Sequence, residues 1–301
     1  MTAAPPLPRA LAAPVVGALT IDVEEYFHVE NLRPVAPPSR WDTFPSRVEG
    51  SVERLLDRLD ERSVRATFFV LGWVAERRPE LVRRIARRGH EVASHGHGHV
   101  RLDELTPARF REDIRHARAV LEDAAQARVL GYRAPTWSIR PATEWALEVL
   151  IEEGYAYDSS VFPVRHDRYG DPQAPVVPHR RVGISGSIVE LPPLVYRVLG
   201  QNLPAGGGGY LRLLPFWFTR LAVRQAVSEG RPVVLYLHPW EIDAGQPWLP
   251  VGLLRGLRHY TGISLVEGRL DRLLAAHRYG RAIDVVAAFE ADEAVLGGKP
   301  S

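Results

Sequence analysis

The sequence has no cysteine among its 301 residues, which excludes disulfides, thiolate metal ligands and a cysteine nucleophile. It also lacks an apolar run of about eighteen residues, so we expect no membrane-spanning helix. Neither sign of charge is in excess, with 38 Lys and Arg against 36 Asp and Glu. No aromatic residues interleave with the arginine pairs at 83–84 and 87–88, which we interpret as solvated helix faces and not as a nucleic-acid-binding surface. With 46% hydrophobic residues, the composition is that of a globular protein with a substantial core.

The apolar stretch at residues 10–19 has the small-residue composition of a short signal segment. Only one arginine, Arg9, precedes it, a proline interrupts it, and it runs directly into Thr20-Ile21-Asp22. We therefore interpret the stretch as part of a buried first strand. Without a signal segment the cytoplasm is the default location, with the cell envelope or periplasm as the alternative.

Strand and helix patterns alternate along the chain, which predicts an α/β fold with a mostly parallel sheet. Strands are expected at about 15–23, 66–71, 90–93, 128–132, 155–158, 187–191 and 232–237. Helices are expected between and after them at about 49–59, 79–88, 106–127, 141–153, 216–228 and 266–277, with Thr106 as an N-cap before a proline. We predict one domain at 1–285 that contains an irregular, proline- and glycine-rich insertion at about 163–215, followed by a flexible tail at 286–301.

Polar residues that could bind a metal or transfer protons stand where the predicted strands end. They are Asp22, Glu24, His95, His99, Arg133, Asp158 and His238. In a closed barrel of parallel strands these ends gather at one rim, whereas an open doubly wound sheet would scatter some of them. We therefore favour a barrel, closed or nearly closed, of about seven strands.

The stretch Ser-His-Gly-His-Gly-His at 94–99 predicts a metal site. Its glycines let the backbone bring imidazoles together, and His95 and His99 are four residues apart, so both can face one cation. With Glu24 they form a ligand set suited to a catalytic divalent metal, zinc first and cobalt, nickel, manganese or iron as alternatives. His97 is then a spacer. A solvated His/Gly loop is the competing interpretation.

The other strand-end residues complete a hydrolytic site. Asp22 is placed to take a proton from an activated water, and Arg133 is suited to hold that carboxylate in place. His238 follows a very apolar strand and is the candidate general acid. Asp158 is a candidate to orient His238, although Asp-Ser-Ser is also a common turn pattern.

Four short motifs occur in a fixed order: Thr-Ile-Asp-Val-Glu at 20–24, Ser-His-Gly-His-Gly-His at 94–99, Arg-Ala-Pro at 133–135 and Leu-Tyr-Leu-His-Pro at 235–239. This series resembles that of the polysaccharide deacetylases, the carbohydrate esterases with a NodB homology domain. The resemblance spans about residues 19–277. Stretches at 167–170, 207–215 and 240–243 look closest to the branch associated with exopolysaccharide loci of the exosortase/PEP-CTERM type.

The resemblance implies a deformed (β/α) barrel and metal-dependent removal of N-acetyl groups from an N-acetylated oligo- or polysaccharide. It implies that the backbone amide of Thr136 binds the oxyanion, and Trp137 and Tyr210 are candidate substrate-binding residues. The usual adjacent pair of aspartates is replaced here by Asp-Val-Glu-Glu at 22–25. Strand phase favours Glu24 as the carboxylate ligand, and Glu25 is the alternative.

Two other functions remain open at the level of sequence. One is an allantoinase-like hydrolase of cyclic amides or imides, which a small closed pocket sealed by a homo-oligomer would favour. The other is a sugar-binding relative without turnover, which tight glycan binding without acetate release would support.

Overall fold

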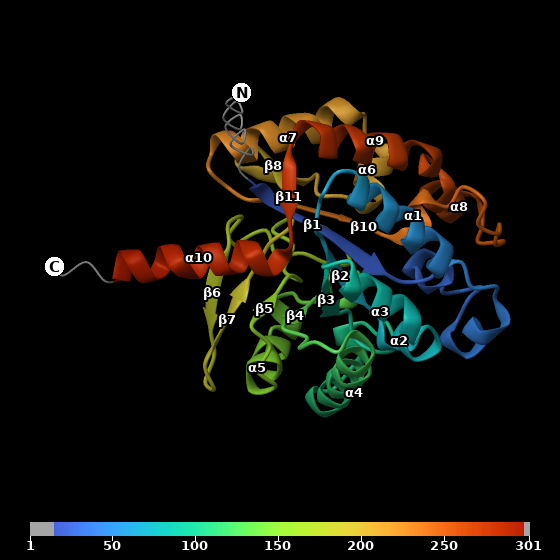
Figure 1. The fold of residues 1–301 in the computed structure, drawn as a ribbon, viewed down its shortest axis with the longest axis horizontal. Helices are drawn as coiled ribbons and strands as arrows, with labels where there is room; N and C mark the ends of the chain where they lie inside the picture. Colours follow the sequence, from blue (N-terminus) through green and yellow to red (C-terminus); the bar gives the residue numbers. More distant parts are fainter. Residues whose placement is uncertain (1–14, 298–301) are drawn as a thin grey trace, which may run out of the picture.

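The computed structural model describes residues 15–297 and contains a sheet whose main path has seven parallel strands in the order β10-β1-β2-β3-β4-β5-β7 (Figure 1). Their bounds are β1 Val15–Val23, β2 Thr67–Val70, β3 Glu91–Ser94, β4 Gly131–Tyr132, β5 Tyr157–Asp158, β7 Ser187–Glu190 and β10 Val233–Leu237. The parallel ladders bring the carboxyl ends of these strands to one edge. At the margins, β6 (His179–Val182) pairs antiparallel with β7, and β11 (Arg278–Gly280) pairs with the beginning of β1.

Irregular backbone joins the two ends of this sheet. In the described part of the chain β7 and β10 share no ladder, but Leu194 N donates to Val234 O at 2.9 Å and Tyr236 N donates to Gly206 O at 2.8 Å. Gly207 makes this approach possible, since a Cβ there would lie 1.6 Å from Tyr236 O. The sheet therefore curls into a deformed barrel of the predicted kind.

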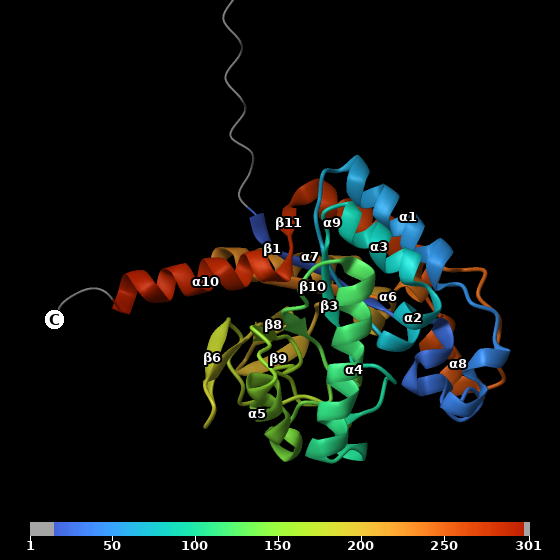
Figure 2. The same cartoon turned by 60° about the horizontal axis from the view of Figure 1, so that its bottom comes forward.

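Most of the helices lie around the outside of the barrel, whereas α10 extends away from it, as Figures 1 and 2 show from two directions. Their bounds are α1 Val48–Glu61, α2 Gly72–Arg77, α3 Pro79–Arg87, α4 Pro107–Ala125, α5 Trp145–Glu152, α6 Gly208–Leu213, α7 Phe216–Ser228, α8 Leu253–Tyr260, α9 Ile263–Ala276 and α10 Ala282–Gly297. Thr106 caps α4 as predicted, because its hydroxyl accepts a hydrogen bond from Arg109 N. None of the helices that the structure describes is long and apolar enough to cross a membrane.

The side chains of β1 alternate between two environments, which orients the site. Leu19, Ile21 and Val23 pack into the large core between sheet and helices, whereas Ala18 belongs to a separate cluster inside the barrel. The two-residue period then places Asp22 on the same face as Ala18, toward the barrel interior.

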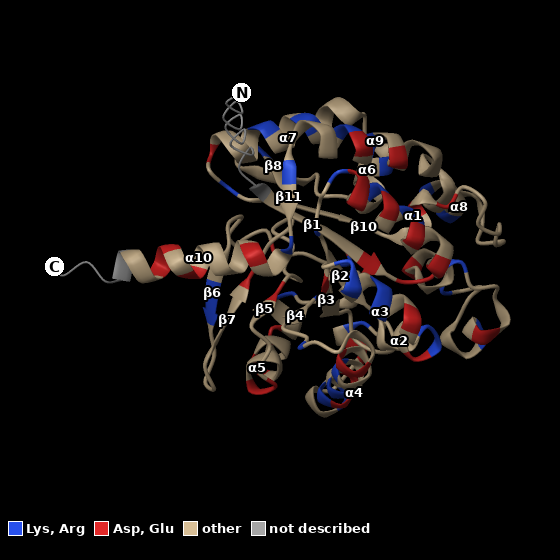
Figure 3. Cartoon of the chain, in the orientation of Figure 1, with Lys and Arg blue, Asp and Glu red and all other residues tan. Residues whose placement is uncertain are grey.

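Charged residues of both signs occur along α1 and α4 (Figure 3). Arg84 of α3 pairs with Glu49 and Glu53 of α1, and Arg88 pairs with Glu53 and Asp57. One arginine of each pair thus takes part in ion pairs between neighbouring helices, whereas Arg83 pairs with Glu80 of its own helix. Such exposed pairs each contribute little to stability.

Two regions are more regular than the sequence predicted. Besides β7, which the sequence predicts at 187–191, the expected irregular insertion at 163–215 contains β6, a second hairpin of β8 (Val195–Val198) and β9 (Gln201–Pro204), and α6. Its strands are only four residues long, so their periodicity is hard to distinguish from that of a loop.

The expected tail at 286–301 instead continues α10 to residue 297. Residues 298–301 lie outside the described part of the chain, and so do residues 10–14 of the first apolar stretch. The helix is anchored because Ala282 and Val286 are buried against the cluster inside the barrel.

Candidate active site

A cavity of about 350 Å³ lies at the carboxyl ends of the strands, within the size range of small-ligand pockets. Most of the residues that the sequence predicts for the site line it: Asp22, Glu24, His95, His99, Thr136, Trp137, Tyr210 and His238. The two exceptions are Arg133, which lies beneath the cavity floor, and Asp158. The barrel thus brings together side chains that are up to 216 residues apart.

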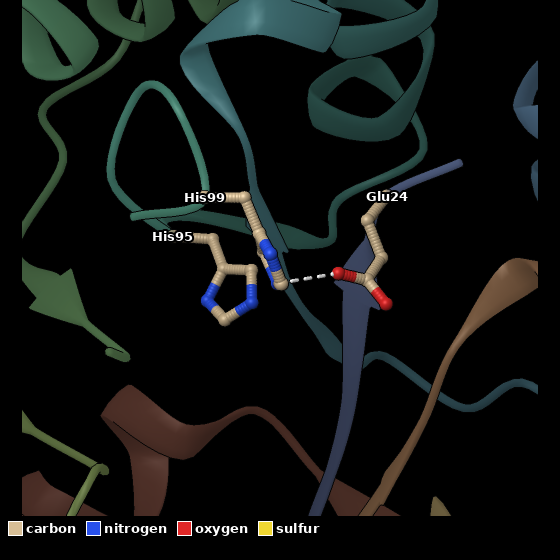
Figure 4. Close-up of side chains that lie close together, drawn as sticks. All are labelled: Glu24, His95 and His99. Carbon is tan, nitrogen blue, oxygen red and sulfur yellow. Dashed lines mark ion pairs between the residues drawn. The ribbon is translucent and has the colours of Figure 1, made fainter. Parts of the chain in front are cut away.

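Glu24, His95 and His99 converge on one another (Figure 4). One ligand atom from each lies within 4.8 Å of the others, and Glu24 Oε2 is 2.7 Å from His99 Nε2. Within the described part of the protein, this buried oxygen has no hydrogen bond of acceptable geometry. This arrangement fits a divalent metal ion. The buried carboxylate oxygen and the two imidazole nitrogens lie close together without hydrogen bonds between them, and one cation would accept a lone pair from each of the three atoms.

Neighbouring groups hold these three side chains in position. His95 Nδ1 donates to the carbonyl oxygen of Arg133 at 2.7 Å, which leaves the lone pair of Nε2 free to bind a metal. Trp240 Nε1 donates to Glu24 Oε1 at 3.0 Å. His99 has a φ of 50°, an uncommon value for a residue other than glycine and one often found at functional sites.

The protonation of two of these groups suits metal binding. Burial lowers the pKa of His95 to about 4, so its imidazole is neutral at pH 7. Burial alone would raise the pKa of Glu24, but the neighbouring His99, with smaller contributions from His238 and His95, lowers it below its usual value. Glu24 is therefore an ionised carboxylate.

Glu25 points away from the cavity. Its carboxylate accepts hydrogen bonds from Ser46 Oγ and from the backbone amides of Arg47 and Val48 at 2.9 and 3.2 Å. These amides belong to the beginning of α1, so Glu25 stabilises a helix N-terminus. The structure thus places Glu24, and not Glu25, beside the two histidines, as strand phase predicts.

Arg133 holds Asp22 from below. Its Nη1 donates to Asp22 Oδ1 at 2.7 Å and to Thr20 Oγ1 at 2.6 Å, and its other nitrogens donate to Ser159 O and Oγ. The guanidinium is fully buried and stacks over Phe69 at 4.1 Å. Arg133 therefore fixes Asp22 with its second oxygen, Oδ2, 3.9 Å from His238 Nε2.

His238 is oriented by Glu241, a residue to which the sequence analysis assigned no role. Glu241 Oε2 accepts from His238 Nδ1 at 2.9 Å, and its other oxygen accepts from Arg212 Nε at 2.7 Å. Burial alone would lower the pKa of His238, but Glu241 and the carboxylates of Asp22 and Glu24 raise it to about 9. His238 is therefore protonated at neutral pH, with Nε2 facing the cavity, as a general acid requires.

The prediction that Asp158 orients His238 is corrected by this geometry. The Asp158 side chain accepts from Ser160 Oγ and lies against the buried carboxyl of Glu190. Burial raises the pKa of Asp158 to about 6 and, together with the charge of Asp158, raises that of Glu190. Asp158 therefore belongs to a buried carboxyl pair that joins β5 to β7.

Aromatic residues form part of the cavity wall. Trp137 packs against Phe162 and Tyr236, and Tyr210 OH lies 2.6 Å from Tyr169 OH in a hydrogen bond. Thr136 and Trp137 have φ values of 58° and 55°. This left-handed turn, which follows Arg133-Ala134-Pro135, places both residues on the cavity wall.

A barrel whose rim carries one carboxylate and two imidazoles beside a buried acid–base pair is typical of hydrolases with a catalytic metal site. Comparison with known proteins agrees. Residues 37–156 match the family model for polysaccharide deacetylases, and residues 159–287 match a domain of unknown function, DUF3473. The middle part of the chain, residues 37–156, is therefore similar to polysaccharide deacetylases, and the curated relatives that it resembles are named as deacetylases.

Similar curated proteins include a peptidoglycan-N-acetylglucosamine deacetylase of Bacillus cereus, 38% identical over 88 residues (29% of this chain and 30% of that protein). A chitooligosaccharide deacetylase of Bradyrhizobium sp. is 40% identical over 82 residues (27% and 37%). The chain thus spans about a third of the length of these relatives.

Two solved structures share the fold. One, from Mycobacterium smegmatis, is assigned to the polysaccharide deacetylases and superposes with a TM-score of 0.64 at 23% identity, over 97% of this chain and 96% of that one. An allantoinase superposes with a TM-score of 0.61 at 18% identity, over 96% and 94%.

Proposed function

We propose that this protein is a metal-dependent polysaccharide N-deacetylase, which hydrolyses N-acetyl groups of amino sugars to acetate and free amine. The observation that carries the proposal is the convergence of Glu24, His95 and His99 beside Asp22 and His238 in one cavity. A divalent cation held by the first three, zinc first among the candidates, supplies Lewis-acid chemistry that activates water and polarises an amide carbonyl.

The residues of the chain divide the proton transfers between them. Asp22, fixed by Arg133, accepts the proton of the attacking water through the oxygen that faces the cavity. The backbone amide of Thr136 binds the oxygen of the acetamide carbonyl as negative charge develops there. His238 donates the proton held on Nε2 to the nitrogen of the sugar as the C–N bond breaks. Water and amide are thereby converted to acetate and amine without any other reactant.

The cavity wall and the named relatives support an N-acetylated glycan as substrate. Trp137, Tyr169 and Tyr210 offer aromatic surface for a sugar ring. Both relatives are named for deacetylation of N-acetylated saccharides. We place the activity in exopolysaccharide synthesis or modification, on the resemblance of the stretches at 167–170, 207–215 and 240–243.

Acetate release tests this function. Purified protein incubated with Zn²⁺ should release acetate from at least one oligomer in a panel of N-acetylated glycans. Asp22→Asn keeps the shape of the side chain but removes the base, so it should slow release roughly 10²–10⁴-fold. Absence of release from every glycan, or equal release by Asp22→Asn and the unmodified protein, would contradict the proposal.

A further inference from the structure

A second group of metal-binding side chains lies on the outer side of the histidine loop. Glu76 of α2, His97 of the loop and His116 of α4 bring one potential ligand atom each within 4.8 Å of the others. His97 Nε2 is 3.2 Å from Glu76 Oε2, and His116 Nε2 is 2.7 Å from Glu76 Oε1. The two imidazole centroids are 4.4 Å apart. This group shares no residue with the cluster of Glu24, His95 and His99.

Backbone hydrogen bonds fix His97 in this outward position. Gly72 N donates to Gly96 O at 2.9 Å, and Trp73 N donates to His97 O at 3.1 Å. His97 N donates to Asp113 Oδ2 at 2.9 Å, and Gly98 N donates to Asp113 Oδ1. The loop is therefore attached to α2 by backbone and to α4 by Asp113, and the His97 ring is directed between the two helices.

The His97 ring has an unmet hydrogen-bonding requirement. In the described part of the protein, its Nε2 is shielded from solvent and has no hydrogen-bond partner, although Glu76 is close. A buried polar atom without a partner is costly, and a cation between the two residues would satisfy it. The His116 side chain is 54% exposed, so an ion has access from solvent.

We propose that Glu76, His97 and His116 form a second divalent metal site, separate from the catalytic cluster. Two imidazoles and one carboxylate suit a borderline cation such as Zn²⁺, with solvent completing the coordination. Such an ion joins α2, α4 and the loop that carries His95 and His99. His97, which the sequence predicts to be a spacer, is a ligand on this account.

An ion-pair network is the competing explanation for the cluster. Arg77 Nη1 lies 3.9 Å from Glu76 Oε2 and competes for that carboxylate, whereas Asp113 is occupied by the two backbone amides. A protonated imidazole pairs with Glu76 without any cation. Zinc stoichiometry separates the two explanations, since an ion-pair network binds no zinc.

The test is a zinc titration of metal-free protein without a polyhistidine tag, read against a competing fluorescent chelator. Unmodified protein should bind two equivalents. His116→Ala and Glu76→Gln should each lower the affinity of one equivalent at least roughly 100-fold, since even the loss of a residue that only orients a ligand costs 10–100-fold. His277→Ala, which removes an imidazole outside both clusters, should leave both equivalents.

The double variant His99→Ala/His116→Ala separates this inference from the proposed function. His99→Ala alone should keep one equivalent, and zinc should raise its Tm, because an ion that binds the folded state stabilises it. The double variant should bind none and show no rise. If His116→Ala and Glu76→Gln both keep the stoichiometry and affinity of the unmodified protein, the second site is refuted, whatever His99→Ala does.

Discussion

Replacing Glu241 by glutamine should lower the pKa of His238 and shift the alkaline limit of activity to lower pH. His238 must be protonated to act as the general acid, and its raised pKa, about 9, keeps it protonated above neutrality. Glu241 makes the largest contribution to that increase. A glutamine side chain is neutral, so the protonated form of His238 loses its nearest counter-charge in the Glu241→Gln variant.

The size of the shift follows from the geometry. The carboxylate and the imidazole are 2.9 Å apart. Opposite charges about 4 Å apart interact by about 4 kcal/mol at an effective dielectric constant near 20, which corresponds to about 3 pKa units. The glutamine oxygen still accepts a hydrogen bond from Nδ1, so we expect a decrease of roughly 1–3 units. The alkaline limb of kcat/KM should then move from about 9 to about 6–8.

Acetate release measured from pH 5 to pH 10 reports this limb directly. Arg212→Gln is the matched control, because it breaks the same buried Arg212–Glu241 pair but leaves the carboxylate on His238. Both variants should lose stability, on the order of 3–5 kcal/mol for an unpaired buried charge. Only Glu241→Gln should lower the alkaline limb. An unchanged limb in Glu241→Gln would refute the assignment of Glu241 as the residue that positions His238.

Two further changes test other parts of the site. Asp158→Asn should flatten the pH dependence of the unfolding free energy. The folded-state pKa of Asp158, about 6, lies above its usual value. The contribution of Asp158 to stability is therefore present at pH 4 and is lost as the pH rises through 6, by on the order of 1–3 kcal/mol. Urea unfolding at pH 4.5 and 7.5 measures the change in unfolding free energy between the two pH values. An equal change in the variant and the unmodified protein would contradict this prediction. Trp240→Phe removes the N–H that donates to Glu24 Oε1 and should weaken metal binding roughly 10–100-fold in a chelator competition, whereas unchanged affinity would show that Glu24 needs no such partner.

The placement of the site could be predicted because it depends on local rules. A strand pattern followed by a helix pattern predicts a parallel strand, and the carboxyl ends of parallel strands share one edge of the sheet. Asp22, His95 and His238 therefore had to lie near one another. Strand periodicity also separated Glu24 from Glu25, whose carboxylate stabilises α1 instead.

The partners of these residues could not be predicted in the same way. Glu241 reaches His238 only because the 3₁₀ turn at Pro239–Ile242 brings residue i+3 back to residue i. A histidine followed directly by a proline, with a carboxylate three residues after the histidine, is a usable sequence signal for such a turn. Glu190 meets Asp158 in the parallel ladder of β5 and β7, whose strands are too short to show a period. Glu76 and His116 approach His97 from two helices, and no sequence spacing encodes that packing.

The role of Glu24 as a ligand of the catalytic metal is tested most directly by the zinc content and acetate release of Glu24→Gln beside Glu25→Gln. The catalytic site should lose its zinc in Glu24→Gln, and acetate release should fall with it. Glu25→Gln should keep both zinc and acetate release while losing roughly 0.5–2 kcal/mol of stability, because it weakens only the cap of α1. Loss of zinc in Glu25→Gln with retention in Glu24→Gln, or acetate release that is independent of zinc in both, would contradict the account.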